Sequence, residues 1–170
     1  MNTIFMKKNN IHSIYIISFL QLKIKYKSNI GERRRGMKIN TVLSEIRDLS
    51  FADAFKAVMK AYGFSNYRLS IAALIPPETI SRYRNAQLRP TKVTLVQLCI
   101  GMSLPYDVSI DLLNKAGINI LTAYSDDVVY ATLLEQSRVV NIYDCNAIIS
   151  SVNEQKSFGE RDIKLFRDSK

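Results

Sequence analysis

Basic side chains are concentrated in one stretch of this sequence, and the chemistry they favour is the binding of anions. Residues 50–92 carry seven basic and two acidic residues, a net charge of +5. Residues 93–155 carry two basic and seven acidic residues, a net charge of −5. The basic stretch favours a polyanion such as nucleic acid as its partner. The acidic stretch should avoid DNA, and its predicted helices at residues 126–152 are available to a second copy or to another protein.

The residue types that catalysis needs are scarce. An active site requires converging groups such as a nucleophile with a base, paired carboxylates or a bound metal. The only histidine is His12, and Cys99 and Cys145 both fall on apolar stripes of predicted helices. This set cannot assemble a zinc site. We therefore expect no enzyme, no metal and no cofactor, and we interpret the cysteines as reduced, buried residues of a cytoplasmic protein.

The spacing of apolar residues predicts an all-α chain from position 50 onwards. Apolar residues recur every three or four positions in seven helices, at about residues 50–62, 66–73, 77–85, 92–102, 106–116, 126–136 and 142–152. The flanking residues agree with these bounds, with N-caps predicted at Ser50, Ser65 and Asn141 and stops at Gly63 and Gly117. Residues 37–49 show little pattern. We interpret residues 154–170 as a polar tail that is frayed or disordered.

Residues 65–91, SNYRLSIAALIPPETISRYRNAQLRPT, contain the most informative motif. A short helix and a tight turn precede a helix that carries Thr-Ile-Ser-Arg at positions 79–82, and the following loop ends in Arg-Pro-Thr. This order resembles the helix-turn-helix core of the lambda-repressor-like (Xre) family, and the flanking helices extend the resemblance over residues 50–117. The resemblance implies a five-helix DNA-binding domain at residues 37–120. The two further helices predicted from apolar spacing form a C-terminal helical hairpin at residues 121–153.

The same resemblance implies which side chains meet double-stranded DNA. A helix about 10–12 Å across fits the major groove, which is about 12 Å wide, and helix 77–85 would lie there. Family members place base contacts on the first turns of this helix, which here are Pro77, Glu78, Thr79 and Arg82. Arg82 would contact guanine O6 and N7, and Glu78 would accept from cytosine N4. Phosphate contacts would come from Ser65, Asn66, Arg84, Asn85, Arg89 and Lys92. The implied protein is a homodimeric transcription regulator of a bacterium or mobile element.

Two places depart from the family pattern. The turn between the two helices usually carries glycine, because one residue there takes a positive φ, but this chain has Leu74. Pro76 and Pro77 replace the polar residues that usually begin the second helix, which removes two backbone donors. We expect a remodelled turn and weaker sequence-specific binding. The alternative function is therefore a degenerate helix-turn-helix that binds protein, as in an antitoxin-like module.

The first 36 residues differ from the rest of the chain. They carry eight basic residues and one acidic residue, and their apolar stretch at residues 11–22 is too short to span a bilayer as a helix. Lysines follow that stretch, where a secretory signal would have a small-residue cleavage site. Purine-only codons can encode residues 31–36, as in a ribosome-binding site translated in error. We hypothesise that the native protein starts at Met37 and that residues 1–36 are a mis-annotated extension. The alternative is that they are a disordered extension, and in either case we expect no membrane association.

Overall fold

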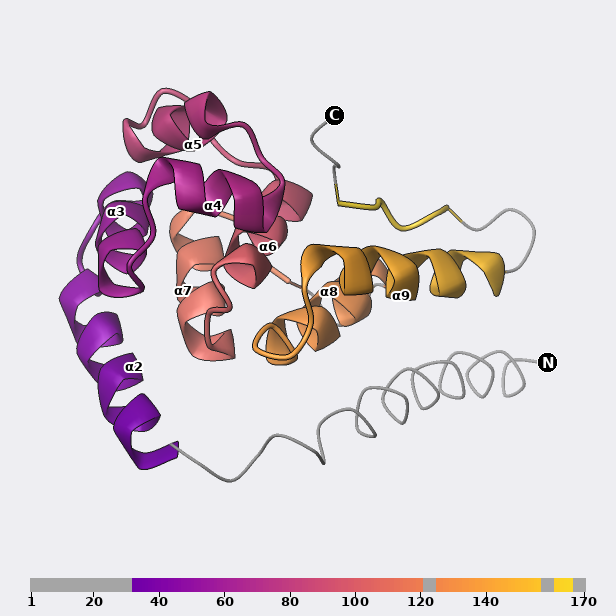
Figure 1. The fold of residues 1–170 in the computed structure, drawn as a ribbon, viewed down its shortest axis with the longest axis horizontal. Helices are drawn as coiled ribbons and strands as arrows, with labels where there is room; N and C mark the ends of the chain where they lie inside the picture. Colours follow the sequence, from indigo (N-terminus) through magenta and orange to yellow (C-terminus); the bar gives the residue numbers. More distant parts are fainter. Residues whose placement is uncertain (1–31, 121–124, 157–160, 167–170) are drawn as a thin grey trace. The chain divides into compact units, whose positions relative to one another are not determined.

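The computed structural model describes residues 32–120, 125–156 and 161–166. These residues form eight helices and no strand. In chain order (Figure 1) the helices are α2 (Glu32–Ile46), α3 (Phe51–Ala61), α4 (Asn66–Ala73), α5 (Pro77–Arg84), α6 (Lys92–Gly101), α7 (Tyr106–Lys115), α8 (Ser125–Glu135) and α9 (Ile142–Glu154). The chain divides into two units, residues 1–32 and 33–170. The hypothesis about residues 1–36 falls almost entirely outside the described residues.

The seven predicted helices are confirmed, and each bound lies within two residues of its prediction. The agreement comes from local signals at the helix ends. Ser50 and Ser65 accept hydrogen bonds from backbone amides three residues on, at 3.3 and 3.1 Å. Asn141 and Asp144 form a reciprocal capping box at 3.0 and 3.2 Å. Such caps satisfy amides that have no partner inside the helix, so they can be read from the sequence.

Helix α6 is the centre of the bundle. It contacts α4, α7, α8 and α9, and residues 95–100 are buried on every side. The sequence predicted a single apolar face containing Leu95, Leu98, Cys99 and Met102, which was incomplete. A helix with neighbours all round has no solvent face to mark its orientation. The basic stretch of the chain and the acidic helices α8 and α9 are therefore attached to the same central element.

Two residues of α6 fix the end of α4. Gln97 donates from Nε2 to the buried backbone carbonyl of Ala73 at 2.7 Å. A Cβ atom at Gly101 would lie 2.7 Å from the Cβ of Ala73 and 2.8 Å from its Cα. Gly101 thus permits a close approach of the two backbones. The side-chain amide of Gln97 satisfies the carbonyl of Ala73 at the end of α4. Together they set the position of α4 on the core.

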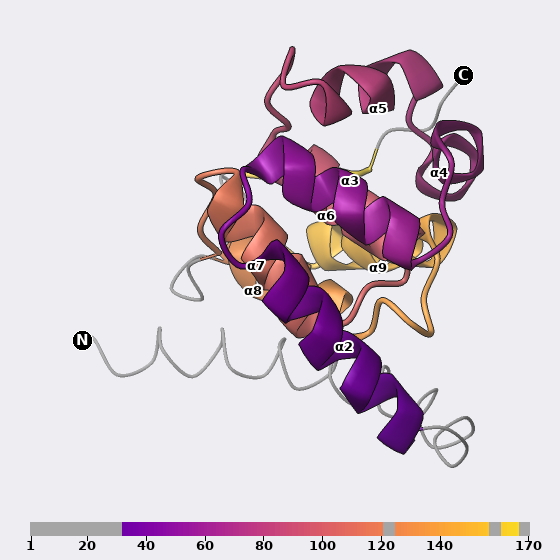
Figure 2. The ribbon, with the colours of Figure 1, turned by 90° about the vertical axis from the view of Figure 1, so that its left-hand side faces the viewer.

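Residues 37–49, where the sequence was read as having little pattern, and residues 161–166, in the predicted polar tail, both contribute buried side chains. Helix α2 continues to Ile46, and its buried Val42 and Ile46 lie four residues apart on one face. Ile39, Val42, Leu43 and Ile46 follow the i, i+3, i+4, i+7 spacing of a helical face, so the sequence did contain a signal for this helix. The N-terminal part of α2 extends away from the other helices (Figure 2). At the other end of the chain, Ile163 and Phe166 are buried. No helix among the described residues is long and apolar enough to cross a membrane.

Both cysteines are free and buried, as predicted. Burial raises the pKa of the Cys99 thiol to about 12. Burial, with a smaller contribution from the nearby Asp144, does the same for Cys145. The thiolate is the reactive form of cysteine, so both side chains behave at neutral pH as small apolar groups of the core.

Candidate nucleic-acid interface

Helices α4 and α5 are joined by a short turn, and they pack against α3 and α6. Helix α4 contacts α5 and α6, and α5 also contacts α3. The buried faces carry Leu69 and Ala73 in α4, and Ile80 and Tyr83 in α5. In Figure 2, α5 lies at the edge of the bundle, above α3. One face of α5 is therefore anchored in the core while the opposite face is turned outward.

The turn between the two helices has a left-handed residue at the position where the sequence resemblance led us to expect glycine. Leu74 adopts φ 53° and ψ 39°, and the amide of Ile75 donates to the carbonyl of Ser70 at 3.2 Å. The prediction of a remodelled turn is wrong, because leucine adopts the conformation that glycine would take. A left-handed non-glycine residue costs about 1–2 kcal/mol. The contacts of α4 with Gln97 and Gly101 offset that strain.

A second left-handed residue closes α5. Ala86 has φ 56°, and the amide of Gln87 donates to the carbonyl of Arg82 at 2.9 Å. Gly63 and Gly117 occupy the same kind of position after α3 and α7. Helix α5 is thus flanked on both sides by left-handed residues that are not glycine, and Ser103, with φ 51°, is a third such residue after α6. Strain of this kind persists only where the surrounding structure imposes it.

The predicted base-reading residues lie on or beside the exposed face of α5. Glu78 and Arg82 are exposed and Pro77 and Thr79 half-buried. Glu78 and Arg82 are four residues apart, so they share one face of the helix. The side chain of Arg82 makes no hydrogen bond or ion pair within the part of the chain that the structure describes. The amide of Thr79 donates to the carbonyl of Pro76 at 3.0 Å, so this end of α5 offers side chains more readily than backbone donors.

Three of the predicted phosphate-contacting residues are engaged inside the protein. Arg84 donates from Nη1 to Oδ1 of Asn66 at 2.7 Å, which ties the end of α5 to the start of α4. Lys92 lies 2.7 and 2.9 Å from the two carboxylate oxygens of Asp127. The side chain of Asp127 is only 3% exposed. These residues position helices, whereas Ser65, Asn85 and Arg89 are exposed.

The neighbouring acidic residues Asp126 and Asp127 have different partners. Asp127 pairs with Lys92, and Asp126 lies 3.8 Å from the ammonium of Lys156. Both carboxylates lie in the first turn of α8, where negative charge also stabilises the helix dipole. The Lys92–Asp127 pair joins the basic stretch directly to α8.

Several residues that shape this interface were not identified from the sequence. Arg68 donates to the carbonyl of Gly63 at 2.8 Å and lies over the ring of Phe64. Tyr67 and Ile71 are exposed on α4. Gln97 and Gly101 could have been noticed as a polar residue and a glycine inside an apolar run. Lys92 and Asp127 are 35 positions apart in the sequence, so no local sequence pattern could have predicted their pairing.

No family model, no curated protein and no solved structure matches this chain. Within the described ranges, no group of three or more histidine, cysteine, aspartate or glutamate side chains is placed to hold a metal ion.

Proposed function

We propose that this chain is a sequence-specific DNA-binding transcription regulator in which α5 reads the major groove. The observation that carries the proposal is the two-sided character of α5. Its Ile80 and Tyr83 face is buried, while Glu78 and Arg82 are exposed on the other face. A guanidinium held on a rigid helix without an internal partner suits a bidentate contact to guanine O6 and N7.

The surrounding contacts suit this role. A recognition helix must meet the groove at a fixed angle, which the first helix of the pair sets. The Arg84–Asn66 hydrogen bond and the close approach of α4 to α6 hold that angle. The exposed Ser65, Asn85 and Arg89 remain available to phosphates. In a homodimer, two such pairs would lie on a two-fold operator, as helix-turn-helix regulators commonly do.

Selection of bound sequences from random duplex DNA tests the proposal, using the full chain at physiological salt. We expect an enriched and roughly palindromic motif. Retention without enrichment would mean that the protein holds the phosphate backbone alone, and it would refute the assignment of base readers to α5. Loss of retention even at low salt would refute DNA binding altogether, because phosphate contacts strengthen as salt falls.

A protein-interaction module is the second candidate function. Helices α8 and α9 carry five acidic residues and no basic residue, which makes a poor surface for DNA. A partner complex that survives high salt while DNA retention is absent would favour this alternative. The two functions are compatible, since they use different helices.

A further inference from the structure

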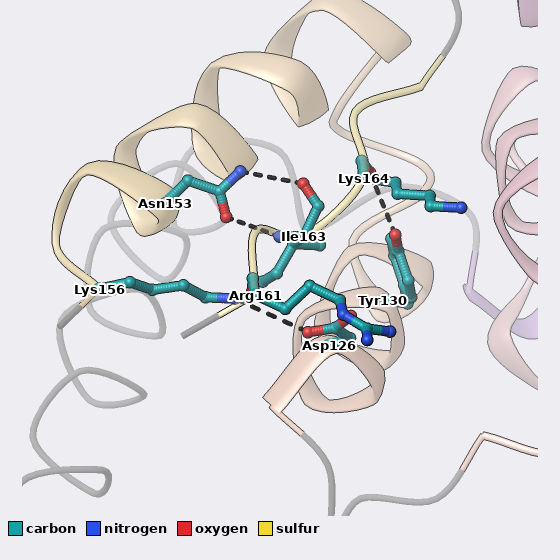
Figure 3. Close-up of polar contacts among 7 residues, drawn as sticks. All are labelled: Asp126, Tyr130, Asn153, Lys156, Arg161, Ile163 and Lys164. Atoms are coloured by element: carbon teal, nitrogen blue, oxygen red, sulfur yellow. Dashed lines mark hydrogen bonds and ion pairs between the residues drawn. The ribbon is translucent and has the colours of Figure 1, made fainter. Parts of the chain in front are cut away.

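The short C-terminal segment (residues 161–166) is held by the side chains of α9 in an unusual way. Asn153 donates from Nδ2 to the carbonyl of Ile163 and accepts from its amide, both at 2.9 Å (Figure 3). Asn146 does the same with Phe166, donating to its carbonyl at 3.2 Å and accepting from its amide at 2.8 Å. A carboxamide carries the donor and acceptor that match one backbone residue. Each asparagine therefore binds the backbone of one residue, and these hydrogen bonds do not depend on the side chain of that residue.

The spacing of the two asparagines matches the segment. They are seven positions apart on α9, about 10.5 Å along a helix that rises 1.5 Å per residue. Three residues of extended chain cover about 10 Å. The later residue of the segment binds the earlier asparagine, so the segment runs antiparallel to α9. Two double hydrogen bonds in register fix an extended backbone along one face of the helix.

Side chains at the same two positions enter the protein. Ile163 and Phe166 are 1% and 2% exposed, whereas Leu165 between them is 48% exposed. The ring of Phe166 lies 6.2 Å from that of Tyr130.

Helix α8 supplies the other wall of the site. The hydroxyl of Tyr130 donates to the carbonyl of Lys164 at 3.1 Å. Burial raises the pKa of Tyr130 to about 12, and Asp126 and Asp127 contribute to the same shift. The phenol therefore stays protonated as a donor. Residues 161–166 contact α8 and α9 together, and we call the surface formed by Tyr130, Asn146 and Asn153 the peptide groove.

Charge complements these contacts. Helices α8 and α9 carry five acidic residues and no basic one, whereas residues 161–170 carry four basic and two acidic residues. Lys156 reaches back to Asp126 and to the carbonyl of Arg161 (Figure 3). The groove thus matches an extended backbone with two apolar side chains three positions apart, and it lies on the acidic helices α8 and α9.

We propose that the peptide groove is a protein-binding site whose ligand is the C-terminal segment of a second copy of this chain, so that two copies exchange residues 161–166 and dimerise. Each contact is made to the segment itself and is equally available to a segment from another molecule. The segment belongs to no helix or strand, so it opens at a smaller cost than the bundle does. Exchange keeps every one of these contacts, which makes it a low-cost route to a dimer. Once one segment has crossed, the second exchange takes place within the complex. The inference does not depend on DNA binding.

Two complementary full-length variants test the exchange. The groove variant carries Asn146→Ala and Asn153→Ala with an intact segment, and the segment variant carries Ile163→Asp and Phe166→Asp with an intact groove. We expect wild type to be a dimer by light scattering after size exclusion, and each variant alone to be a monomer. An equimolar mixture should form a heterodimer, because one intact groove then meets one intact segment in trans.

Matched controls separate the groove from general damage. Leu165→Asp places the same charge on the exposed position of the segment, and Asn114→Ala removes an exposed asparagine of α7. Both should remain dimeric. Asn153→Asp, a milder change that keeps the acceptor and loses the donor, should weaken the dimer about tenfold.

Three results would overturn the proposal. The first is a wild-type chain that stays monomeric at every concentration, even if the mixed variants form a heterodimer. Dimers that persist in both variants would place the contact elsewhere in the molecule. Folded variants, verified by circular dichroism, that remain monomeric when mixed would show that the segment does not bind in trans.

Discussion

Helix α5, in the basic half of the molecule, and helix α9, in the acidic half, differ in how their exposed or polar side chains are engaged. On α5, Glu78 and Arg82 are exposed, and the Arg82 side chain is not engaged by any described residue. On α9, Asn146 and Asn153 are each matched to both polar groups of one backbone residue. A rigid polar group without a partner points to a ligand outside the chain. The two asparagines are already hydrogen-bonded to residues 161–166, so this segment shows which kind of backbone they bind.

The two halves meet at α6 and at the Lys92–Asp127 pair. Helix α6 contacts α4 on the basic side and α8 and α9 on the acidic side. Lys92, which the sequence predicted to bind phosphate, instead forms an ion pair with the carboxylate of Asp127, whose side chain is 3% exposed. The net charge of the basic stretch therefore overstates what it offers to DNA. Charge counts along a sequence record where ionic groups are, and only the structure tells which of them are already neutralised.

The largest expected effect is on stability and comes from Gly101→Ala, which disturbs the contact between α4 and the central helix α6. The new methyl group would meet the Cβ, Cα and N atoms of Ala73 at 2.7–2.9 Å, and backbone atoms cannot rotate away. We expect a loss of about 2–3 kcal/mol in the free energy of unfolding, measured in urea.

Gly117→Ala is the matched control for this substitution. Nothing lies within 4 Å of a Cβ at Gly117, but its φ is +72°. We expect a loss of about 1–2 kcal/mol from backbone strain alone. Equal losses in the two variants would contradict the role of Gly101 in a close helix contact.

Arg82→Ala should have the next largest effect, and only on DNA. We expect binding to the selected operator to weaken by about 1–3 kcal/mol, with relaxed preference at one base position. Arg138→Ala removes an exposed arginine from the acidic half and should leave the affinity unchanged. Competition titration on operator and scrambled duplexes measures both. An Arg82→Ala profile identical to wild type would remove Arg82 from the base readers.

Local signals account for what the sequence could predict. Helix bounds followed from caps such as Ser50, Ser65 and Asn141, which act within three residues. The exposure of Glu78 and Arg82 followed from the helical period of Ile80 and Tyr83. The sequence could not predict that Asn66 and Arg84 bind each other, or that Lys92 meets Asp127, because these pairs are fixed by tertiary packing. The docking of Ile163 and Phe166 was missed because a period of three in a polar tail belongs to no helix or strand.

Lys92→Ala should cost about 1–2 kcal/mol in stability, because it leaves the carboxylate of Asp127 buried without its lysine partner. The partial exposure of Lys92 keeps the loss below that of a fully buried pair. Thermal unfolding measures the change.

The effect of Lys92→Ala on DNA binding tests whether Lys92 only holds α8 in place through Asp127 or also contacts a DNA phosphate. If Lys92 only holds α8 in place, the salt dependence of DNA binding should be unchanged. Arg89→Ala, at an exposed position, should reduce the salt slope by about one while leaving stability intact. A reduced salt slope with unchanged stability in Lys92→Ala would restore the original expectation for this residue.

The smallest effect tests the strain around α5. Ala86 is exposed and has φ 56°, so Ala86→Gly removes strain without removing a packed side chain. We expect a gain of about 0.5–1 kcal/mol in the free energy of unfolding. Ala57→Gly, inside α3, should lose about the same amount, because glycine is unfavourable in a helix. Leu74→Gly should lie between the two, since relief of strain is offset by loss of a half-buried apolar side chain. If Ala86→Gly destabilised the protein as Ala57→Gly does, the left-handed turn after α5 would be unstrained, and the contrast with the glycine-ended helices α3 and α7 would fail.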